Sequence, residues 1–285
     1  MKLVLYVAVA VGAFVALSLV SFWLAVRPPR MVIPLSPADF KLTVEEVSIP
    51  TADGLRLSAW LVPKPGAPAI VLLHGYPAEK ADLLPMAAAL AGRFTVLLLD
   101  LRYFGRSEGR VTTLGLRERV DLRRTIDALV ARGFTGFGVF GLSLGGAVAM
   151  MTAAEDRRIR AIAVYAPFSD LRALGHELYA WMGPLRYPFV ATMRVWSRLF
   201  LGGDITAASP LVAAPRLAIP VYFIASRADE QIGFQHAERL RVALADNARA
   251  EFELMDRGRH GELPANVESR LERFFLRYLG PVGGS

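Results

Sequence analysis

The segment Gly141-Leu142-Ser143-Leu144-Gly145 constrains the fold of this chain more than any other feature. An apolar run over residues 137–140 enters it, and a run of small and apolar residues over 146–150 follows it. This context predicts a buried strand that turns sharply into a helix, with Ser143 at the bend in a strained conformation. Side chains two residues away on either side would crowd the serine, so glycine is needed at both positions. The N-terminus of the helix would then face negative charge that develops on a substrate.

A serine hydroxyl is a weak nucleophile unless a base takes its proton and an acid orients that base. Around a turn of this kind the partners follow in the order serine, acid, histidine. The buried run over 220–225 precedes a polar segment with two candidate acids, Asp229 and Glu230. His260 lies in a polar loop beside glycines, after an alternating strand pattern over 250–254. A histidine in such a loop has no core to fill, which predicts that it is the base.

A second loop is expected to complete the site by donating hydrogen bonds to the substrate oxygen. His74-Gly75-Tyr76-Pro77 follows the apolar run over 69–73, the position at which such a loop is expected. We expect the backbone N–H groups of Tyr76 and Leu144 to form the oxyanion hole. His74 is then interpreted as a residue that holds the loop and moves no proton.

Two histidines remain outside this arrangement. His236 falls on a predicted helix among Glu238, Arg239 and Arg241, and we interpret it as part of a solvated helix face. His176 falls in an insertion described below and is interpreted as a surface or substrate-lining residue. With no cysteine in the chain, a thiol nucleophile, a disulfide framework and a cysteine–zinc site are all excluded.

Together these motifs resemble the α/β-hydrolase superfamily, and within it the branch of serine-aminopeptidase-like and monoacylglycerol-lipase-like hydrolases. The resemblance covers roughly residues 43 to 279 and favours Asp229 over Glu230 as the acid. It is carried by His74-Gly75-Tyr76-Pro77, Asp100-Leu101-Arg102-Tyr103-Phe104-Gly105-Arg106-Ser107-Glu108-Gly109, Gly141-Leu142-Ser143-Leu144-Gly145-Gly146, Ala166-Pro167-Phe168-Ser169-Asp170, Asp229 and His260. The family implies serine chemistry through Ser143, Asp229 and His260, and it says little about the substrate.

The order of predicted elements agrees with that family. We expect a mostly parallel eight-stranded sheet with helices on both faces, in a hydrolase domain over residues 43–285. The predicted strands are 43–49, 55–62, 69–74, 94–100, 136–142, 160–166, 220–226 and 250–256. The predicted helices are 81–92, 114–131, 146–155, 233–245 and 264–278. The first two strands are expected to pair antiparallel around the turn at 52–54.

A separate apolar stretch precedes the domain. Leu3 to Val26 is long enough to span a bilayer, which takes about 20 residues. A cleaved signal peptide has an apolar core of only about 7–15 residues. The segment Leu24-Ala25-Val26-Arg27 offers no good cleavage site. We therefore expect an uncleaved membrane anchor over 1–30 and a proline-rich tether over 31–42, with cleavage as the alternative. Charge barely discriminates the orientation, and the short N-terminal tail favours an extracytoplasmic domain.

An insertion interrupts the alternation of strands and helices. Roughly 50 residues separate Asp170 from Pro220, where a single helix would suffice, and connections of that length are usually functional. We interpret residues 171–217 as a helical lid over the serine. Its aromatic side chains are expected to line an apolar acyl pocket, to pack on the core or to dip into a membrane. The substrate-lining candidates are Tyr179, Trp181 and Trp196.

Charge and motifs narrow the remaining functions. The formal net charge is +7 and the sequence pI is about 10.0. The basic residues are scattered, however, and on the helix around 117–124 they alternate with acidic ones, so a nucleic-acid partner is not indicated. Attraction to anionic lipid headgroups suits an anchored protein better. We find no phosphate loop, dinucleotide fingerprint or metal-binding motif, so no cofactor or metal is expected. The oligomeric state stays open.

The resulting hypothesis is a membrane-anchored serine hydrolase that cleaves carboxylic esters, lipid-like or other acyl esters, through an acyl-enzyme. One alternative is a serine peptidase or acyl-protein thioesterase, because the same residues serve ester, amide and thioester chemistry. An alternative of another class is a binding protein that keeps the fold without turnover, since a fold alone never implies activity.

Overall fold

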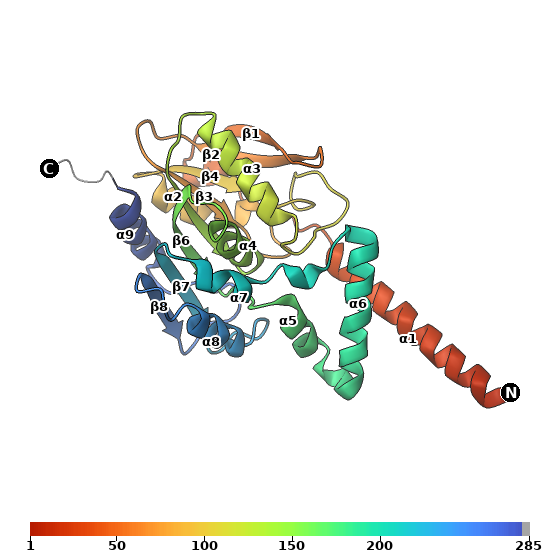
Figure 1. Cartoon of the computed structure of the whole chain (residues 1–285). Coiled ribbons are helices and arrows are strands. Elements are labelled where there is room, and N and C mark those ends of the chain that lie inside the picture. Colours follow the sequence, from red (N-terminus) through yellow and green to blue (C-terminus); the bar gives the residue numbers. More distant parts are fainter. Residues whose placement is uncertain (281–285) are drawn as a thin grey trace.

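The computed structural model describes residues 1–280, in which eight strands form one sheet at the centre of the molecule (Figure 1). The strand order is β1-β2-β4-β3-β5-β6-β7-β8. β1 pairs antiparallel with β2, and β2 antiparallel with β4, whereas the other neighbours are parallel. The strands are β1 (Glu45–Pro50), β2 (Arg56–Val62), β3 (Ala69–Leu73), β4 (Thr95–Leu99), β5 (Phe137–Leu142), β6 (Ile159–Tyr165), β7 (Val221–Ser226) and β8 (Ala250–Met255). The predicted sheet is confirmed, including its antiparallel first pair.

Helices cover both faces of the sheet, as the sequence predicts. On one face α3 (Glu118–Val130), α4 (Leu144–Ala153) and α8 (Phe234–Ala243) enclose a large apolar core. On the other face α2 (Leu84–Leu90) and α9 (Val267–Leu279) enclose a second core. The side chains of β3 alternate between the two cores, and every residue of this strand is buried. A strand buried on both faces needs a continuous apolar run, which explains the composition of β3, β4 and β5.

Residues 171–217, which we call the insertion segment, connect β6 to β7. They contain α5 (Leu171–Leu178), η3 (Ala180–Leu185), α6 (Arg186–Leu201), η4 (Ile205–Ala207), α7 (Pro210–Ala213) and η5 (Ala214–Arg216). Figure 1 shows α5 and α6 standing away from the sheet. The helical character predicted for this segment is therefore confirmed.

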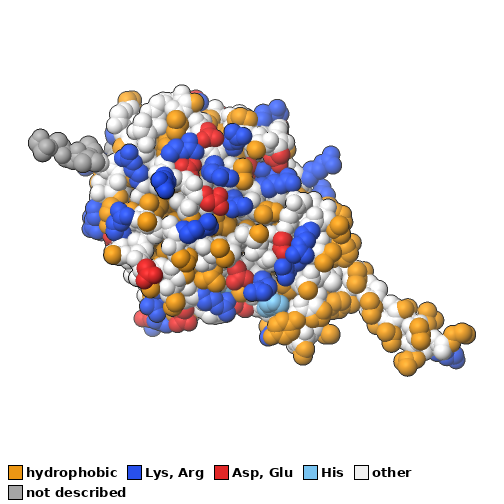
Figure 2. All heavy atoms as spheres, viewed as in Figure 1, with side chains coloured by type: hydrophobic (Ala, Val, Ile, Leu, Met, Phe, Trp, Pro, Cys, Tyr) orange, Lys and Arg blue, Asp and Glu red, His pale blue; other side chains and the backbone are white. Residues whose placement is uncertain are grey.

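The first helix, α1 (Lys2–Val26), projects away from the domain and most of its surface is exposed (Figure 1). Its 25 residues correspond to about 37 Å of helix. An 18-residue stretch of it has a mean hydropathy of 2.7, so by length and composition the helix could cross a membrane or serve as a signal sequence. Figure 2 shows hydrophobic side chains gathered along α1 and over the adjoining end of the molecule, whereas charged side chains are spread over the rest of that face.

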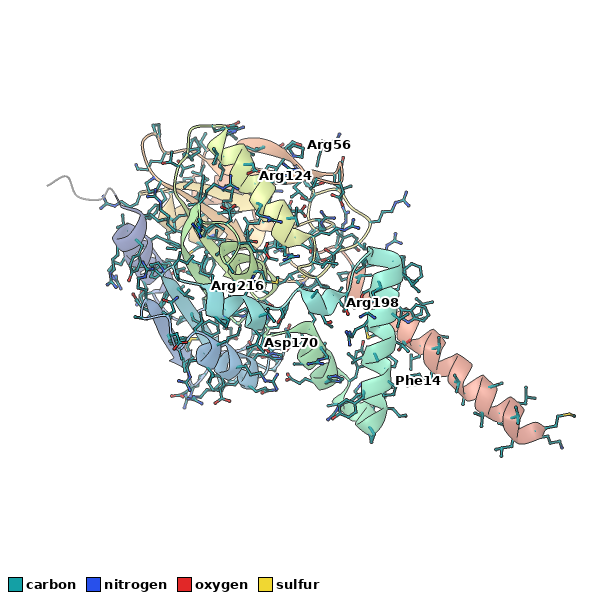
Figure 3. All side chains as sticks on the ribbon, in the orientation of Figure 1. Phe14, Arg56, Arg124, Asp170, Arg198 and Arg216 are labelled. Atoms are coloured by element: carbon teal, nitrogen blue, oxygen red, sulfur yellow. The ribbon has the colours of Figure 1, made fainter. Side chains whose placement is uncertain are left out.

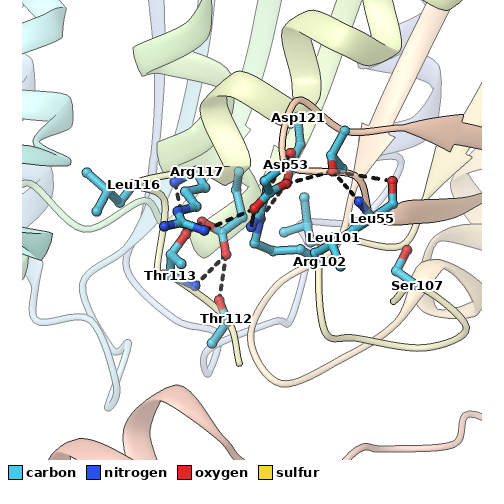
Figure 4. Close-up of polar contacts among 12 residues, drawn as sticks. Asp53, Leu55, Leu101, Arg102, Ser107, Thr112, Thr113, Leu116, Arg117 and Asp121 are labelled. Carbon is cyan, nitrogen blue, oxygen red and sulfur yellow. Dashed lines mark hydrogen bonds and ion pairs between the residues drawn. The ribbon is translucent and has the colours of Figure 1, made fainter. Parts of the chain in front are cut away.

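A partly buried ionic network fixes the loop between β4 and α3 (Figure 4). Arg102 Nε donates to Asp121 Oδ2 at 2.6 Å, and Arg102 Nη1 donates to Asp53 Oδ2 at 3.0 Å. Arg117 Nη1 also donates to Asp53 Oδ2 at 3.0 Å. The hydrogen bonds from Arg102 hold the pKa of Asp53 well below its usual value. Arg102 near the start of this loop and Arg117 at its end both bind Asp53 in the β1–β2 turn, so the loop is held at both ends.

The chain that leaves α1 lies on this loop and on the domain. The N–H of Thr112 donates to Val26 O at 2.9 Å, and the Tyr103 hydroxyl donates to Pro28 O. Farther along, the N–H of Ile33 donates to Glu79 Oε1 at 2.7 Å. The short helix η1 (Pro37–Phe40) follows before β1 begins. The proline-rich residues 31–42 therefore form specific contacts with the domain that follows them.

Candidate active site

The turn at Ser143 has the strained geometry that its sequence predicts. Ser143 lies between β5 and α4 with φ 48° and ψ −109°, and its N–H donates to Tyr165 O at 2.8 Å. A Cβ on Gly141 would lie 2.3 Å from Gly145 O, and a Cβ on Gly145 would lie 2.4 Å from Leu73 O. No real Cβ tolerates such contacts with backbone, so the turn excludes every residue but glycine at both positions.

An acid and a histidine lie together at the carboxyl ends of later strands. His260 Nδ1 and Asp229 Oδ2 are 2.7 Å apart, and both side chains are almost fully buried. Glu230 instead accepts a hydrogen bond from the backbone N–H of His260 at 3.1 Å. Of the two candidate acids, Asp229 therefore contacts the imidazole. Because an ionised carboxylate only accepts, the His260 proton belongs on Nδ1, which leaves Nε2 with a lone pair.

Hydrogen bonds from His260 and from two backbone groups keep Asp229 ionised. Burial alone would raise the pKa of this carboxyl. The hydrogen bond from His260 opposes burial, as do those from the N–H groups of Ile232 at 2.8 Å and Gln231 at 2.9 Å. Together these hydrogen bonds lower the pKa of Asp229 by more than burial raises it, so this pKa lies below its usual value. The carboxylate can therefore orient the imidazole and offset a positive charge on it over a wide pH range.

Tyr165, at the end of β6, connects the serine turn to the histidine loop. Its carbonyl oxygen accepts from the N–H of Ser143. Its hydroxyl lies 3.2 Å from Arg259 O and 3.1 Å from Glu262 O, and its ring centroid lies 6.5 Å from that of His260. Within residues 1–280 no hydrogen bond joins the Ser143 hydroxyl directly to His260. Contacts between a nucleophile and its base often tighten only when substrate binds.

The loop after β3 is held by a buried histidine. His74 Nε2 accepts from the N–H of Leu101 at 3.0 Å, and His74 Nδ1 lies 2.7 Å from Gly75 O. The proton therefore belongs on Nδ1, and burial lowers the pKa of this histidine. Phe104 packs edge-on against the rings of both His74 and Tyr76, at centroid distances of 5.4 and 5.8 Å. His74 thus has the surroundings of a structural residue.

Two backbone donors are available beside the serine. Across the described part of the chain, the N–H groups of Tyr76 and Leu144 have no protein partner. Leu144 is the first residue of α4, where N–H groups have no partner inside the helix. Both residues line the same cavity as Ser143. This arrangement suits an oxygen that gains negative charge when a carbonyl carbon at Ser143 is attacked.

An apolar cavity of about 360 Å³ opens on Ser143. Its wall is formed mainly by apolar side chains of the insertion segment, with a contribution from α1. The lining residues are Ala25, Tyr76, Leu114, Ser143, Leu144, Phe168, Leu171, Leu174, Gly175, Leu178, Tyr179, Val190, Met193, Arg194, Ile205, Thr206, Glu230, Gln231 and Ile232. A cavity of this size and character suits a small ligand with an apolar group.

Only one of the three predicted substrate-lining aromatics reaches this cavity. Tyr179 lines it. Trp181 is 75% exposed, because it lies in η3 at the outer end of the insertion segment. Trp196 lies on α6 and points its indole toward α1, where Nε1 donates to Ser18 Oγ. Trp181 and Trp196 are not among the residues that line this cavity, and an amphipathic pattern does not distinguish a face toward substrate from one toward solvent or another helix.

The interpretation of His236 as a solvated residue is wrong. His236 is completely buried, and its Nδ1 accepts from the N–H of Ser169 at 3.0 Å. Its Nε2 lies 3.0 Å from Glu177 Oε2 on α5, with poor alignment for a hydrogen bond. The charged residues nearby in the sequence suggested a solvated face. The apolar Leu240, four residues later and buried, instead places His236 on the apolar face of α8. His176 packs against Tyr187 and lies outside the Ser143 cavity.

The fold and the serine turn define an α/β hydrolase. The chain belongs to the alpha/beta hydrolase family, because residues 70–274, most of its length, match the model of that family. Within the described residues, no three His, Asp or Glu side chains are grouped to hold a metal ion.

Several known proteins are similar to this chain. An uncharacterized protein of Mycobacterium tuberculosis is 30% identical over 211 residues, which are 72% of this chain and 68% of that protein. The thiohydrolase aneE of Aspergillus aculeatus is 34% identical over 141 residues, 45% of this chain and 43% of aneE. Among solved structures, a Pyrococcus furiosus esterase superposes with a TM-score of 0.73 at 25% identity, covering 90% of this chain and 99% of the esterase. The comparisons support a hydrolase.

Proposed function

We propose that this protein is a membrane-anchored serine hydrolase that cleaves carboxylic esters with an apolar acyl group. The observation that carries the proposal is that a serine turn, an apolar cavity and a histidine–carboxylate pair all lie at the carboxyl ends of the parallel strands. A strained serine after β5 opens on an apolar cavity, and a histidine after β8 is hydrogen-bonded to a buried carboxylate after β7. Similarity to an esterase of known structure supports ester chemistry.

The reaction follows from the groups in place. Ser143 Oγ attacks the acyl carbon while His260 Nε2 takes the hydroxyl proton, and Asp229 stabilises the resulting imidazolium. The carbonyl oxygen becomes an oxyanion, which the N–H groups of Tyr76 and Leu144 stabilise. When the tetrahedral intermediate collapses, the bond to the alcohol oxygen breaks and His260 gives that oxygen its proton. Water then attacks the acyl-enzyme by the same route and releases the acid and free Ser143.

The anchoring role of α1 is supported by its length, its apolar composition and its contacts. Phe22 and Val26 are completely buried against the insertion segment. Cleavage after the apolar stretch would expose the residues that pack against these two side chains. These contacts favour an uncleaved helix over a signal peptide. The exposed apolar residues of its first half, such as Val9, would then face lipid.

The test uses the full-length protein in detergent with a fluorophosphonate probe and p-nitrophenyl esters. We expect the parent to be labelled and to hydrolyse the esters. Ser143→Ala and His260→Ala are expected to lose labelling, and their turnover is expected to fall at least 10³-fold. Ser48→Ala, a serine exposed on β1, is the matched control and should behave as the parent. Turnover by Ser143→Ala comparable to that of the parent would exclude the proposed nucleophile.

A thioester substrate is the second candidate, because one relative is named a thiohydrolase. The same groups would serve, with a thiolate in place of the alkoxide leaving group. Matched esters and thioesters with one acyl chain separate the two candidates. A kcat/KM ratio far in favour of the thioester, beyond its greater reactivity with hydroxide, would replace the ester assignment.

A further inference from the structure

The C-terminal half of α1 packs along the insertion segment. Figure 3 labels Phe14 on α1, beside α6. The rings of Phe14 and Phe189 meet edge-on at a centroid distance of 5.5 Å, and those of Phe22 and Phe200 stack at 6.3 Å. Phe189 lies in the first turn of α6 and Phe200 in its last turn. Because contacts later in α1 fall later in α6, the two helices run in the same direction, and these contacts extend over about two turns of α1.

This packed face of α1 reaches the Ser143 cavity. Ala25 follows Phe22 by three residues and precedes Val26, so it lies on or beside the face that carries these two buried side chains. Ala25 packs against the same apolar cluster and lines the cavity together with Ser143, Tyr179 and Met193. A residue of the apolar N-terminal helix thus lines the space that opens on the candidate nucleophile.

The end of α1 is held in this place by polar contacts. Val26 O accepts from the N–H of Thr112, and Pro28 O accepts from the hydroxyl of Tyr103. Arg30 lies over the ring of Tyr103, 5.0 Å from its centroid, and donates to Gly109 O at 3.2 Å. With three successive attachments, the last turn of α1 cannot slide along the domain without breaking hydrogen bonds.

We propose that the last turns of α1 form a wall of the substrate cavity and that Ala25 determines how much of an acyl chain the cavity accepts. This inference rests on the proposed function, because it names the acyl part of the substrate as the group that contacts α1. A small side chain at this position leaves room beside Met193 and Tyr179. A larger one occupies that room and prevents burial of part of a long chain. Each methylene that loses burial lowers kcat/KM about fourfold, equivalent to about 0.8 kcal/mol.

The test compares Ala25→Leu with Ala16→Leu in the full-length protein in detergent. Ala16 lies on the exposed side of the same helix, so Ala16→Leu is a matched control. The measured quantity is the ratio of kcat/KM for p-nitrophenyl octanoate to that for p-nitrophenyl acetate. In Ala25→Leu we expect this ratio to fall at least tenfold, because two methylenes of the octanoyl chain that lose burial lower kcat/KM by about fourfold each. Ala16→Leu should keep the parent ratio. A folded Ala25→Leu protein with the parent ratio overturns the inference.

A smaller residue provides a second test that does not depend on accommodating leucine. In Ala25→Gly the cavity gains space, and the chain length of highest kcat/KM is expected to move to a longer ester. An unchanged optimum in Ala25→Gly, with Ala25→Leu unfolded, also overturns the inference. Failure of the proposed function is separate, because it appears in the parent as absent fluorophosphonate labelling and absent turnover of every ester.

Discussion

Trp196 Nε1 donates a hydrogen bond to Ser18 Oγ at 3.0 Å, which joins α6 to α1 across 178 positions of the sequence. Ser18 is completely buried, and its hydroxyl donates in turn to Val15 O at 2.8 Å. Along α1 the bond lies between two aromatic contacts of the helix pair, Phe14–Phe189 and Phe22–Phe200. The N-terminal helix and the insertion segment are therefore joined by a specific polar contact as well as by apolar packing.

Removing the donor or the acceptor of this bond should destabilise the helix pair. We expect Trp196→Phe and Ser18→Ala each to lower the free energy of unfolding in detergent, with a coupling energy of about 0.6 kcal/mol between them. Chemical unfolding of the two single variants and the double variant measures this energy. Trp181→Phe, at an exposed indole, is the control and should have little effect. Strict additivity of the two single variants would mean that the bond contributes nothing.

Asp229 and Glu230 should differ in their effect on turnover. In Asp229→Asn the amide no longer holds the proton on His260 Nδ1, and we expect kcat to fall about 10³- to 10⁴-fold. In Glu230→Gln the side chain can still accept from the backbone N–H of His260, so we expect a loss below tenfold. Steady-state kinetics with one p-nitrophenyl ester measure both. Equal losses in the two variants would contradict the contact at 2.7 Å as the one that orients the ring.

The glycine at 145 should be irreplaceable. A Cβ there would lie 2.4 Å from Leu73 O and 2.7 Å from His74 O, and β3 is held between β4 and β5. We expect Gly145→Ala to lower the free energy of unfolding by about 1–3 kcal/mol and fluorophosphonate labelling about 100-fold. Gly92→Ala, where nothing lies within 4 Å of the added Cβ, should change neither by much. Normal labelling of Gly145→Ala would show that the turn tolerates a side chain.

His236 should make the protein less stable in mild acid. Burial, reinforced by Arg239, lowers the pKa of His236, although Glu177 and Asp170 act in the opposite direction. Above the unfolded pKa of about 6.5 this histidine is neutral in both states. Below it, only the unfolded chain takes up the proton readily, so stability is lost as the pH falls toward the lower folded pKa.

The measurement compares unfolding at pH 7.5 and pH 5.5 in the parent and in His236→Asn, which keeps an acceptor for the N–H of Ser169. We expect the parent to lose up to about 1 kcal/mol more than the variant over this range. His74 shifts in the same direction and is present in both proteins, so only the difference reports on His236. An equal loss in the two proteins would contradict the shift.

The central sheet could be predicted from the sequence because its signals are local. The residues of β3, β4 and β5 are continuous apolar runs between polar turns, and such runs are typical of strands buried on both faces. The turn at Ser143 could be predicted for a related reason, since its two glycines are needed by contacts within a few residues or with the adjacent strand.

The contacts between α1 and α6 could not be predicted in this way. Both helices are apolar on more than one side, and the pattern does not indicate which side faces lipid, solvent, the cavity or the other helix. The position of Ala25 at the cavity depends on contacts with residues more than 80 positions away. One of these is Thr112, whose N–H donates to the carbonyl oxygen of the neighbouring Val26. For the same reason the sequence suggested Trp196 as a substrate contact, whereas the structure places it against Ser18.

The contacts of residues 28–40 with the domain have a mechanical consequence. A flexible linker would let the domain swing through a large volume around the end of α1. Here Pro28 O accepts a hydrogen bond from Tyr103, and the N–H of Ile33 donates to Glu79. These contacts restrict movement of α1 relative to the domain that follows it. If α1 spans a bilayer, the cavity is held at a nearly constant height and tilt relative to the lipid. A substrate dissolved in that bilayer would then reach the cavity by a two-dimensional search in the plane of the membrane.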